Sequence, residues 1–258
     1  MQASLAGQAV LAPGLADWAA ARAVLLGSAP YVPGPAPDPA PTLLPTAERR
    51  RASASVRWAL AVAQQALAGR DADAVATVFA SCGGDGAITH QICEALASPQ
   101  GVVSPTRFHN SVHNAPAGYW SIATRSQAAS TSLSGFEGSF AIGLLEAATQ
   151  AAIERRSVLL VAYDLPYPEP MHALWPVAHP FAAALLLDPP GSGPAAFRLN
   201  LRPGAARALA WPPSIPAAFQ SNPAAQALPL LAACLRAGPT ELALPYDADS
   251  HLALEIPQ

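Results

Sequence analysis

The residues best placed to do chemistry lie at one corner of the chain, where a short run of β type meets an apolar helix. Residues 127–133 predict the strand, and the apolar spacing over residues 137–153 predicts the helix. A strand that turns sharply into a buried helix holds the corner residue in a pocket, at the positive end of the helix dipole. Enzymes that use such a turn place serine or cysteine at its tip, so this corner is the first place to look for a catalytic group.

The corner carries Phe136-Glu137-Gly138 in place of a nucleophile. Ser132, Ser134 and Ser139 lie close by, but none has the Gly-x-Ser-x-Gly spacing that lets the backbone pass a serine on both sides. Glu137 falls in the first helical turn, where the helix dipole favours a carboxylate by roughly 0.3–1 kcal/mol. Two interpretations stay open for Glu137: a helix-start carboxylate, or an acid/base group that acts on a substrate.

Other reactive side chains do not combine into a familiar site. His109 and His113 could share a helix face, but no third metal ligand is evident nearby. Cys82, Cys93 and Cys234 form no C-x-x-C pair, which predicts buried, reduced thiols. All 14 basic residues are arginines, so lysine Schiff-base chemistry is excluded. We expect neither a metal nor a cofactor.

Length and charge limit the remaining classes of function. A chain of 258 residues can bury a large α/β core, and its net charge of −3 gives no basic surface for nucleic acid. No apolar run approaches the ~20 residues that span a bilayer, and no basic segment precedes an apolar one at the N-terminus. We therefore expect a soluble, cytoplasmic protein without nucleic-acid binding or a membrane span.

Apolar periodicity predicts the elements that position the corner. Residues 73–80 and 157–163 are nearly continuous apolar runs, which are typical of strands buried on both faces. The Pro-rich segment 31–45 cannot be helical. A helical patch ends near residues 118–120. The other predicted strands are 8–12, 180–188, 197–201, 241–244 and 252–256, and the other predicted helices are 16–26, 46–67, 87–96 and 223–236.

Two segments around the corner resemble β-ketoacyl synthases. Asn114-Ala-Pro-Ala-Gly-Tyr-Trp-Ser-Ile122 is similar to the Asn-x-x-Ala-Gly-x-x-Ser-Ile segment before their catalytic cysteine, and residues 134–144 resemble their nucleophile elbow. Matching the helix by Leu144 puts the cysteine position on Glu137, with a slip towards Gly135 left open. The run 108–122, taken with the following helix, resembles the short ketosynthase-like proteins of aryl polyene and xanthomonadin-type pigment clusters.

The resemblance covers residues 1–190 and implies a thiolase-like α/β fold. It implies an N-terminal ketosynthase half with a reduced C-terminal part, in α/β/α layers around a mixed, mostly parallel sheet. On this view residues 1–190 form the ketosynthase-like domain. Residues 191–258 form a reduced C-terminal extension that packs on the same domain.

The sequence departs from the synthases at every catalytic position. No placement puts a cysteine at the corner, the only histidine after residue 180 is His251, and lysine is absent. Synthases supply two catalytic histidines and a lysine from their second half. In this respect the chain resembles chain-length factors, which keep the synthase scaffold without its nucleophile.

This resemblance implies a non-catalytic subunit that pairs as a heterodimer with a complete, full-length β-ketoacyl-ACP synthase. The subunit would shape the acyl tunnel in aryl polyene or fatty-acid-like polyketide biosynthesis. An acyl carrier protein would bind transiently, and a homodimer would cover the same surface in isolation. The residues that the resemblance places on the tunnel or interface are Phe108, Val112, Asn114, Tyr119, Trp120, Phe136 and Glu137.

Alternatives remain at this stage. Glu137 could serve a thioester-processing enzyme that catalyses malonyl decarboxylation or acyl transfer, and the chain could instead be a stand-alone acyl-binding protein. Each of the apolar tunnel residues could be ordinary core packing. The cluster Arg49-Arg50-Arg51 fits either a contact with an acidic carrier protein or a solvated helix face.

Overall fold

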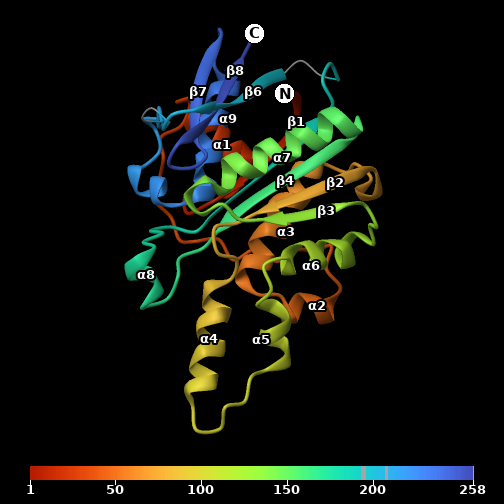
Figure 1. The fold of residues 1–258 in the computed structure, drawn as a ribbon, viewed down its shortest axis with the longest axis vertical. Helices are drawn as coiled ribbons and strands as arrows, with labels where there is room; N and C mark the ends of the chain where they lie inside the picture. Colours follow the sequence, from red (N-terminus) through yellow and green to blue (C-terminus); the bar gives the residue numbers. More distant parts are fainter. Residues whose placement is uncertain (193–195, 207–208, 258) are drawn as a thin grey trace.

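The computed structural model describes residues 1–192, 196–206 and 209–257, and an eight-stranded mixed sheet forms its centre (Figure 1). The strand order is β3-β2-β4-β5-β1-β6-β8-β7. The α/β class and the mixed sheet expected from the sequence are confirmed. The strands are β1 (Gln2–Leu11), β2 (Val75–Ala80), β3 (Ser130–Leu133), β4 (Ser157–Asp164), β5 (Phe181–Asp188), β6 (Ala196–Pro203), β7 (Thr240–Pro245) and β8 (Ser250–Ile256).

The expectation that the sheet is mostly parallel is wrong. Among the described strands, β2 pairs in parallel with β3 and β4, whereas every other neighbouring pair is antiparallel. Parallel pairing needs a crossover, which α7 (Ser139–Glu154) supplies between β3 and β4. The chain returns from β4 to β5 without a crossover over the sheet, so β5 runs antiparallel to β4. β8 likewise runs antiparallel to β7.

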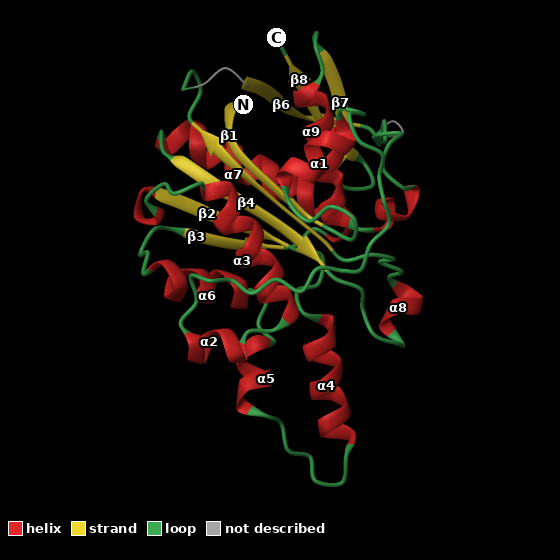
Figure 2. Cartoon of the chain, turned by 180° about the vertical axis from the view of Figure 1, so that it is seen from behind, coloured by secondary structure: helices red, strands yellow, loops and turns green. Residues whose placement is uncertain are grey.

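Helices cover both faces of the sheet in the expected α/β/α layers (Figures 1 and 2). On one face lie α3 (Ala54–Leu67) and α6 (Ala115–Thr124). On the other lie α7, α1 (Trp18–Leu25) and α9 (Ala227–Leu235). The remaining helices are α2 (Thr46–Arg51), α4 (Gly86–Ala97), α5 (Pro105–Asn110) and α8 (Met171–Leu174), and the 3-10 helices are η1 (Ala72–Ala74), η2 (Phe136–Gly138), η3 (Ala217–Ser221) and η4 (Pro223–Gln226).

The central strands explain why the sequence reads as continuous apolar runs. In β4, Leu159 and Val161 join the core under α3, and Leu160 and Ala162 join the core under α7. Successive side chains of a strand point to opposite faces, so both sets must be apolar when helices cover both faces. β2, β4 and β5 are almost entirely buried for this reason.

Two helices differ from the sequence expectation. Residues 46–67 form two helices instead of one, because Ala52 is extended and the Ser53 hydroxyl caps the second helix by accepting from the Val56 N–H at 3.4 Å. The patch expected to end near residues 118–120 continues to Thr124, where Arg125 adopts the left-handed conformation that ends the helix. Apolar periodicity predicts neither the break at Ala52 nor the helix end at Thr124.

The C-terminal elements share a core with the N-terminal part. Phe219 and Leu228 are buried in one apolar cluster with Phe140 and Leu144 of α7. The boundary at residue 190 stays a prediction, and its neighbours 193–195 lie outside the described residues. In the part of the chain that the structure describes, no helix is long and apolar enough to cross a membrane.

A helical arm made of α4, α5 and their connecting loop projects from the body (Figures 1 and 2). Gly86 and Asn110 are the buried residues of its two helices, and the Asn110 side chain donates to the Arg51 carbonyl at 2.7 Å. Exposed apolar side chains grouped on a projection are typical of an interaction surface. Those along the arm and just after it are Leu96, Val102, Phe108 and Val112.

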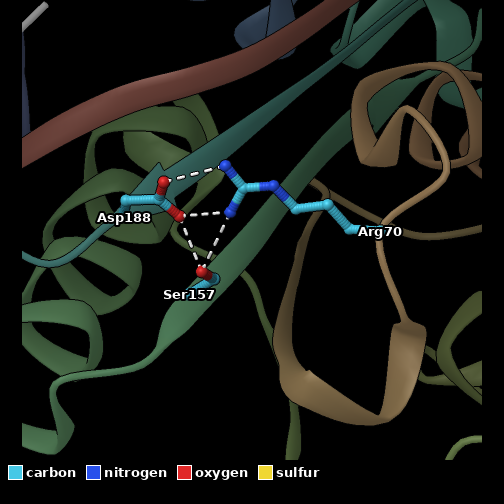
Figure 3. Close-up of polar contacts among 3 residues, drawn as sticks. All are labelled: Arg70, Ser157 and Asp188. Carbon is cyan, nitrogen blue, oxygen red and sulfur yellow. Dashed lines mark hydrogen bonds and ion pairs between the residues drawn. The ribbon is translucent and has the colours of Figure 1, made fainter. Parts of the chain in front are cut away.

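A charged clamp fastens the far end of the central strands (Figure 3). Arg70 reaches Asp188 through two nitrogens, at 2.6 and 2.9 Å, and Ser157 donates to the same carboxylate at 2.6 Å. The Arg70 hydrogen bond holds the pKa of Asp188 below its usual value. The clamp joins the loop after α3 to the start of β4 and the end of β5.

Candidate functional site

The corner between β3 and α7 has the sharp backbone turn that the sequence predicted. β3 ends at Leu133, a single 3-10 turn covers Phe136–Gly138, and α7 begins at Ser139. Phe136 has a φ of +50°, a left-handed conformation that is unusual for a bulky residue. The Ser139 hydroxyl accepts from the Gly135 N–H at 3.0 Å and donates to the Phe136 carbonyl at 2.6 Å, which closes the turn.

Neither Phe136 nor Glu137, the two side chains at the corner, is placed for acid/base catalysis. The Phe136 ring is 62% exposed and stacks on Trp175 of the loop after β4, with centroids 5.8 Å apart and planes 20° apart. The Glu137 side chain is exposed and makes no hydrogen bond or ion pair within the described residues. Its carbonyl accepts from the Gln226 amide at 2.7 Å, so the C-terminal part is tied directly to the turn.

A buried polar cluster beneath the corner fixes its position. Ser81 and Cys82 follow β2, and Asp164 ends β4, at the carboxyl ends of parallel strands. The Ser81 hydroxyl and the Cys82 N–H each donate to Asp164 Oδ1 at 2.8 Å. The Ser134 hydroxyl donates to the Cys82 carbonyl at 2.6 Å. Cys82 therefore connects the buried Asp164 carboxyl group to Ser134 at the corner.

The protonation of this cluster argues against a substitute nucleophile. Burial raises the pKa of Asp164 to about 7, although the Ser81 hydroxyl and the Cys82 N–H oppose the rise. Burial, together with the nearby Asp164 charge, raises the pKa of the Cys82 thiol to about 11. The thiolate is the nucleophilic form, and a pKa of about 11 keeps Cys82 in the thiol form at neutral pH.

The three cysteines are free, but the expectation that all are buried is wrong. Cys82 is buried, Cys234 is half-buried in α9, and Cys93 is exposed on the arm. Cys93 lies outside the core because α4 belongs to the projecting arm, in which Gly86 is the only buried residue of that helix.

The residues expected on the tunnel or interface separate into three groups. Tyr119 and Trp120 are buried in the core under α3, and Asn114 stands exposed before the first turn of α6. Phe108, 67% exposed, ends the arm with Val112, 49% exposed. The third group is the corner itself, Phe136 and Glu137. The seven residues therefore do not form a single site within this chain.

An open groove of about 540 Å³ lies between α6 and β3. His113, Asn114, Gly118 and Ser121 line it on the helical side, and Ser130 and Ser132 line it on the strand side. β3 is the last strand of the described sheet on this side, so one edge of its backbone is unpaired. An unpaired edge beside a groove is a ready template for another chain.

The second half of a synthase would bring catalytic histidines to the corner, and this chain does not do so. His251 lies on β8, where its Nδ1 contacts the Gly204 carbonyl at 2.7 Å. Among the described residues, no group of three or more His, Cys, Asp or Glu side chains could hold a metal ion.

Sequence reasoning missed two residues of the site, Trp175 and Asp164. A signal existed for Asp164, because a carboxylate directly after a buried apolar strand is unusual and must be paired. Trp175 sits in a Pro-rich loop, and nothing in the sequence connects it to Phe136. Their proximity depends on the return of the chain from β4 to β5.

The structure resembles solved ketosynthase structures, and two of them match over its whole length. A ketosynthase (ApeO) in complex with its chain length factor (ApeC) from Xenorhabdus doucetiae matches with 26% identity, a TM-score of 0.74 and complete coverage of both chains. The ishigamide ketosynthase/chain length factor matches with 13% identity, a TM-score of 0.75 and the same coverage. A β-ketoacyl synthase from Burkholderia phymatum matches with 14% identity and a TM-score of 0.61, over 80% of this chain and 65% of that one.

No curated protein sequence matches the chain. A family model does match, and it describes the N-terminal domain of β-ketoacyl synthases, which aligns with residues 22–251. That match covers most of the chain and includes the corner, helices of both layers and the strands from β2 to β7. The thiolase-like topology, the strand-to-helix corner and this match agree, and the chain belongs to the β-ketoacyl synthase family through its N-terminal domain.

Proposed function

We propose that this chain is a chain-length factor, a non-catalytic subunit that pairs with a complete β-ketoacyl-ACP synthase and shapes its acyl tunnel. The observation that carries the proposal is the corner, which keeps its sharp backbone turn while Phe136 occupies the left-handed position. An aromatic ring cannot form an acyl-enzyme. We assign the degenerate nucleophile position to Phe136, one residue before the position given by counting from Leu144.

The comparisons support a synthase partner. Two of the matched structures are named as complexes of a ketosynthase with a chain length factor, and each matches over the whole of both chains. A third, with 12% identity and a TM-score of 0.70, is named as an acyl carrier protein in complex with its ketosynthase. We therefore propose aryl polyene or related polyketide biosynthesis as the setting, with a carrier protein as a transient partner.

The surface that fits the partner runs from the edge of β3 to the arm. Thr77 and Ser81 of the β2 side donate to the carbonyls of Ala129 and Leu133, so the backbone groups of Ser130 and Ser132 face the open edge. The groove behind this edge and the exposed Phe108 and Val112 extend the same surface. A partner strand at the edge would satisfy the unpaired backbone groups, and a partner face would cover the apolar arm.

The enzyme alternative finds no support in the corner. Glu137 is exposed and lacks a hydrogen-bonded partner among the described residues, whereas a catalytic carboxylate needs burial or a neighbour that adjusts its pKa. The nearest buried thiol, Cys82, is protonated at neutral pH.

The test uses the backbone of the edge strand. Ser132→Pro removes an N–H that faces the open edge, and proline is tolerated at such edges, so the isolated chain should stay folded. Ser132→Ala is the matched control because it changes the side chain and keeps the N–H. We expect wild type and Ser132→Ala to copurify with a co-expressed synthase and Ser132→Pro to lose most of the complex.

Product analysis completes the test. The synthase, a carrier protein and malonyl-thioester extender units are combined with each variant, and product lengths are measured by mass spectrometry. Products should reach full length only with variants that form the complex. A covalent acyl group on this chain alone, or an unchanged product profile when it is omitted, would overturn the proposal.

A further inference from the structure

A second cavity, of about 440 Å³, lies between the corner and the C-terminal extension. Glu137 borders it on the corner side, and Trp211, Pro223 and Pro245 border it on the other side. It is separate from the groove beside β3, because the two share none of their described lining residues. The surface proposed for the synthase partner, from the edge of β3 to the arm, includes none of these lining residues.

Most polar groups around the cavity are already occupied within the protein. The Trp211 N–H donates to the Ile215 carbonyl at 2.9 Å, which leaves the indole an apolar surface. The Ser221 hydroxyl accepts from the Ala178 N–H and donates to the Ala218 carbonyl, both at 3.0 Å. The Gln226 amide nitrogen donates to the Glu137 carbonyl at 2.7 Å. None of these three groups is left to select a ligand.

Three polar groups remain: the Glu137 carboxylate, the Gln220 side chain and the side-chain carbonyl oxygen of Gln226, which is buried. None of them makes a hydrogen bond or an ion pair within the described part of the chain, and no arginine or histidine is among the described lining residues. The rest of the wall is apolar, with the indole, Leu209, Pro223 and Pro245. Among the described lining residues, one carboxylate without a basic neighbour stands beside an aromatic and apolar wall, which favours a cation that carries an apolar group.

We propose that this cavity is a binding site for a small primary or secondary amine with an apolar chain. The ammonium group would pair with the Glu137 carboxylate and the chain would lie along Trp211, Pro223 and Pro245. An anionic ligand, such as a phosphate or a free carboxylate, would be repelled by Glu137, and none of the described lining residues is basic. No titratable lining residue other than Glu137 is described, so the site binds and does not catalyse.

The test compares three probes of the same length: pentylamine, 1-pentanol and pentanoate. The full chain is titrated at low ionic strength, and binding is followed through the indole N–H signal of Trp211 in nitrogen-proton NMR spectra, assigned with a Trp211→Phe variant. An exposed ion pair and a cation–aromatic contact together predict that the amine binds about three- to tenfold more tightly than the alcohol. Pentanoate should bind more weakly than either.

Glu137→Gln supplies the matched control, because it keeps the size and hydrogen-bonding capacity of the side chain and removes its charge. In this variant the preference for the amine over the alcohol should disappear while the alcohol affinity stays unchanged. Added salt should reduce the same preference in the wild type. An amine that binds no better than the alcohol, a preference that survives Glu137→Gln, or shifts confined to other indole signals would each overturn the proposal. None of these outcomes bears on complex formation with a synthase.

Discussion

Asp164 should make the stability of the fold fall as the pH rises from about 4 towards neutrality. Its carboxyl group is buried at the end of β4, and burial raises its pKa from 3.8 to about 7. Between these two pH values the folded chain holds a proton that the unfolded chain releases. Stability is therefore fully present below the unfolded pKa and is lost as the pH rises through the folded pKa.

The size of the effect follows from the pKa difference. A rise from 3.8 to about 7, at ~1.36 kcal/mol for each pKa unit, corresponds to roughly 4 kcal/mol across the whole range. Between pH 5 and pH 8, a range accessible to experiment, the free energy of unfolding should fall by about 2–3 kcal/mol. The carboxyl group is completely buried, so solvent screening reduces this figure little.

The perturbation is Asp164→Asn, which keeps the acceptor for Ser81 and Cys82 and removes the titration. The free energy of unfolding is measured in urea at several pH values from 5 to 8, for wild type and variant. Replacing the carboxyl group by an amide changes the free energy of unfolding by the same amount at every pH. The slope of the free energy of unfolding against pH is therefore the quantity to compare. We expect the wild-type curve to fall with pH relative to that of the variant.

Ser81→Ala provides a second check, because it keeps the Asp164 carboxyl group and changes its pKa. The Ser81 hydroxyl lowers the pKa of Asp164, so its removal should carry the steep part of the stability curve to higher pH. Parallel curves for wild type and Asp164→Asn would refute the reasoning, because they would mean that the carboxyl group has the same pKa in the folded and unfolded chains.

Two further predictions concern single contacts. Arg70→Ala should lower the free energy of unfolding by about 1 kcal/mol near neutral pH, a modest figure because the Arg70 side chain is 42% exposed. The partner Asp188 has a lowered pKa, so this contribution is present above the usual aspartate pKa and is lost as the pH falls below it, which urea titrations at pH 3 and 7 would detect. Gly138→Ala should cost about 1–3 kcal/mol in thermal or urea unfolding, because the added Cβ would collide with the Tyr246 carbonyl oxygen. Gly118→Ala is its control, since a Cβ there meets nothing within 4 Å and should stabilise α6 by about 0.5–1 kcal/mol; equal effects at the two glycines would contradict the steric argument.

The sequence predicts those parts of the fold in which local pattern and tertiary packing agree. β2, β4 and β5 were predictable because strands covered on both faces must be apolar throughout. The direction of β5 was not, because strand direction depends on how the loop after Asp164 returns, and apolar spacing is the same in either direction. The break at Ala52 also escaped prediction, since both flanking helices keep helical spacing.

The corner shows a finer limit of the same kind. Counting back seven residues from Leu144 assumes one continuous α-helix and reaches Glu137. The structure inserts a 3-10 turn before α7, and such a turn advances fewer residues for each revolution than an α-helix. The left-handed residue in this turn is Phe136, and the placement of the nucleophile position stays a prediction. A helix-matching argument cannot detect a change of helix type at the first turn.

The C-terminal extension has a structural role at the corner that its weak resemblance conceals. Gln226 binds the Glu137 carbonyl, and Gly138 lies so close to the Tyr246 carbonyl that no side chain fits between them. The Asn222 side chain donates to the Asp164 carbonyl at 2.8 Å. The extension thus holds the turn and the end of β4 through two side-chain amides, those of Gln226 and Asn222, and one close backbone approach at Gly138.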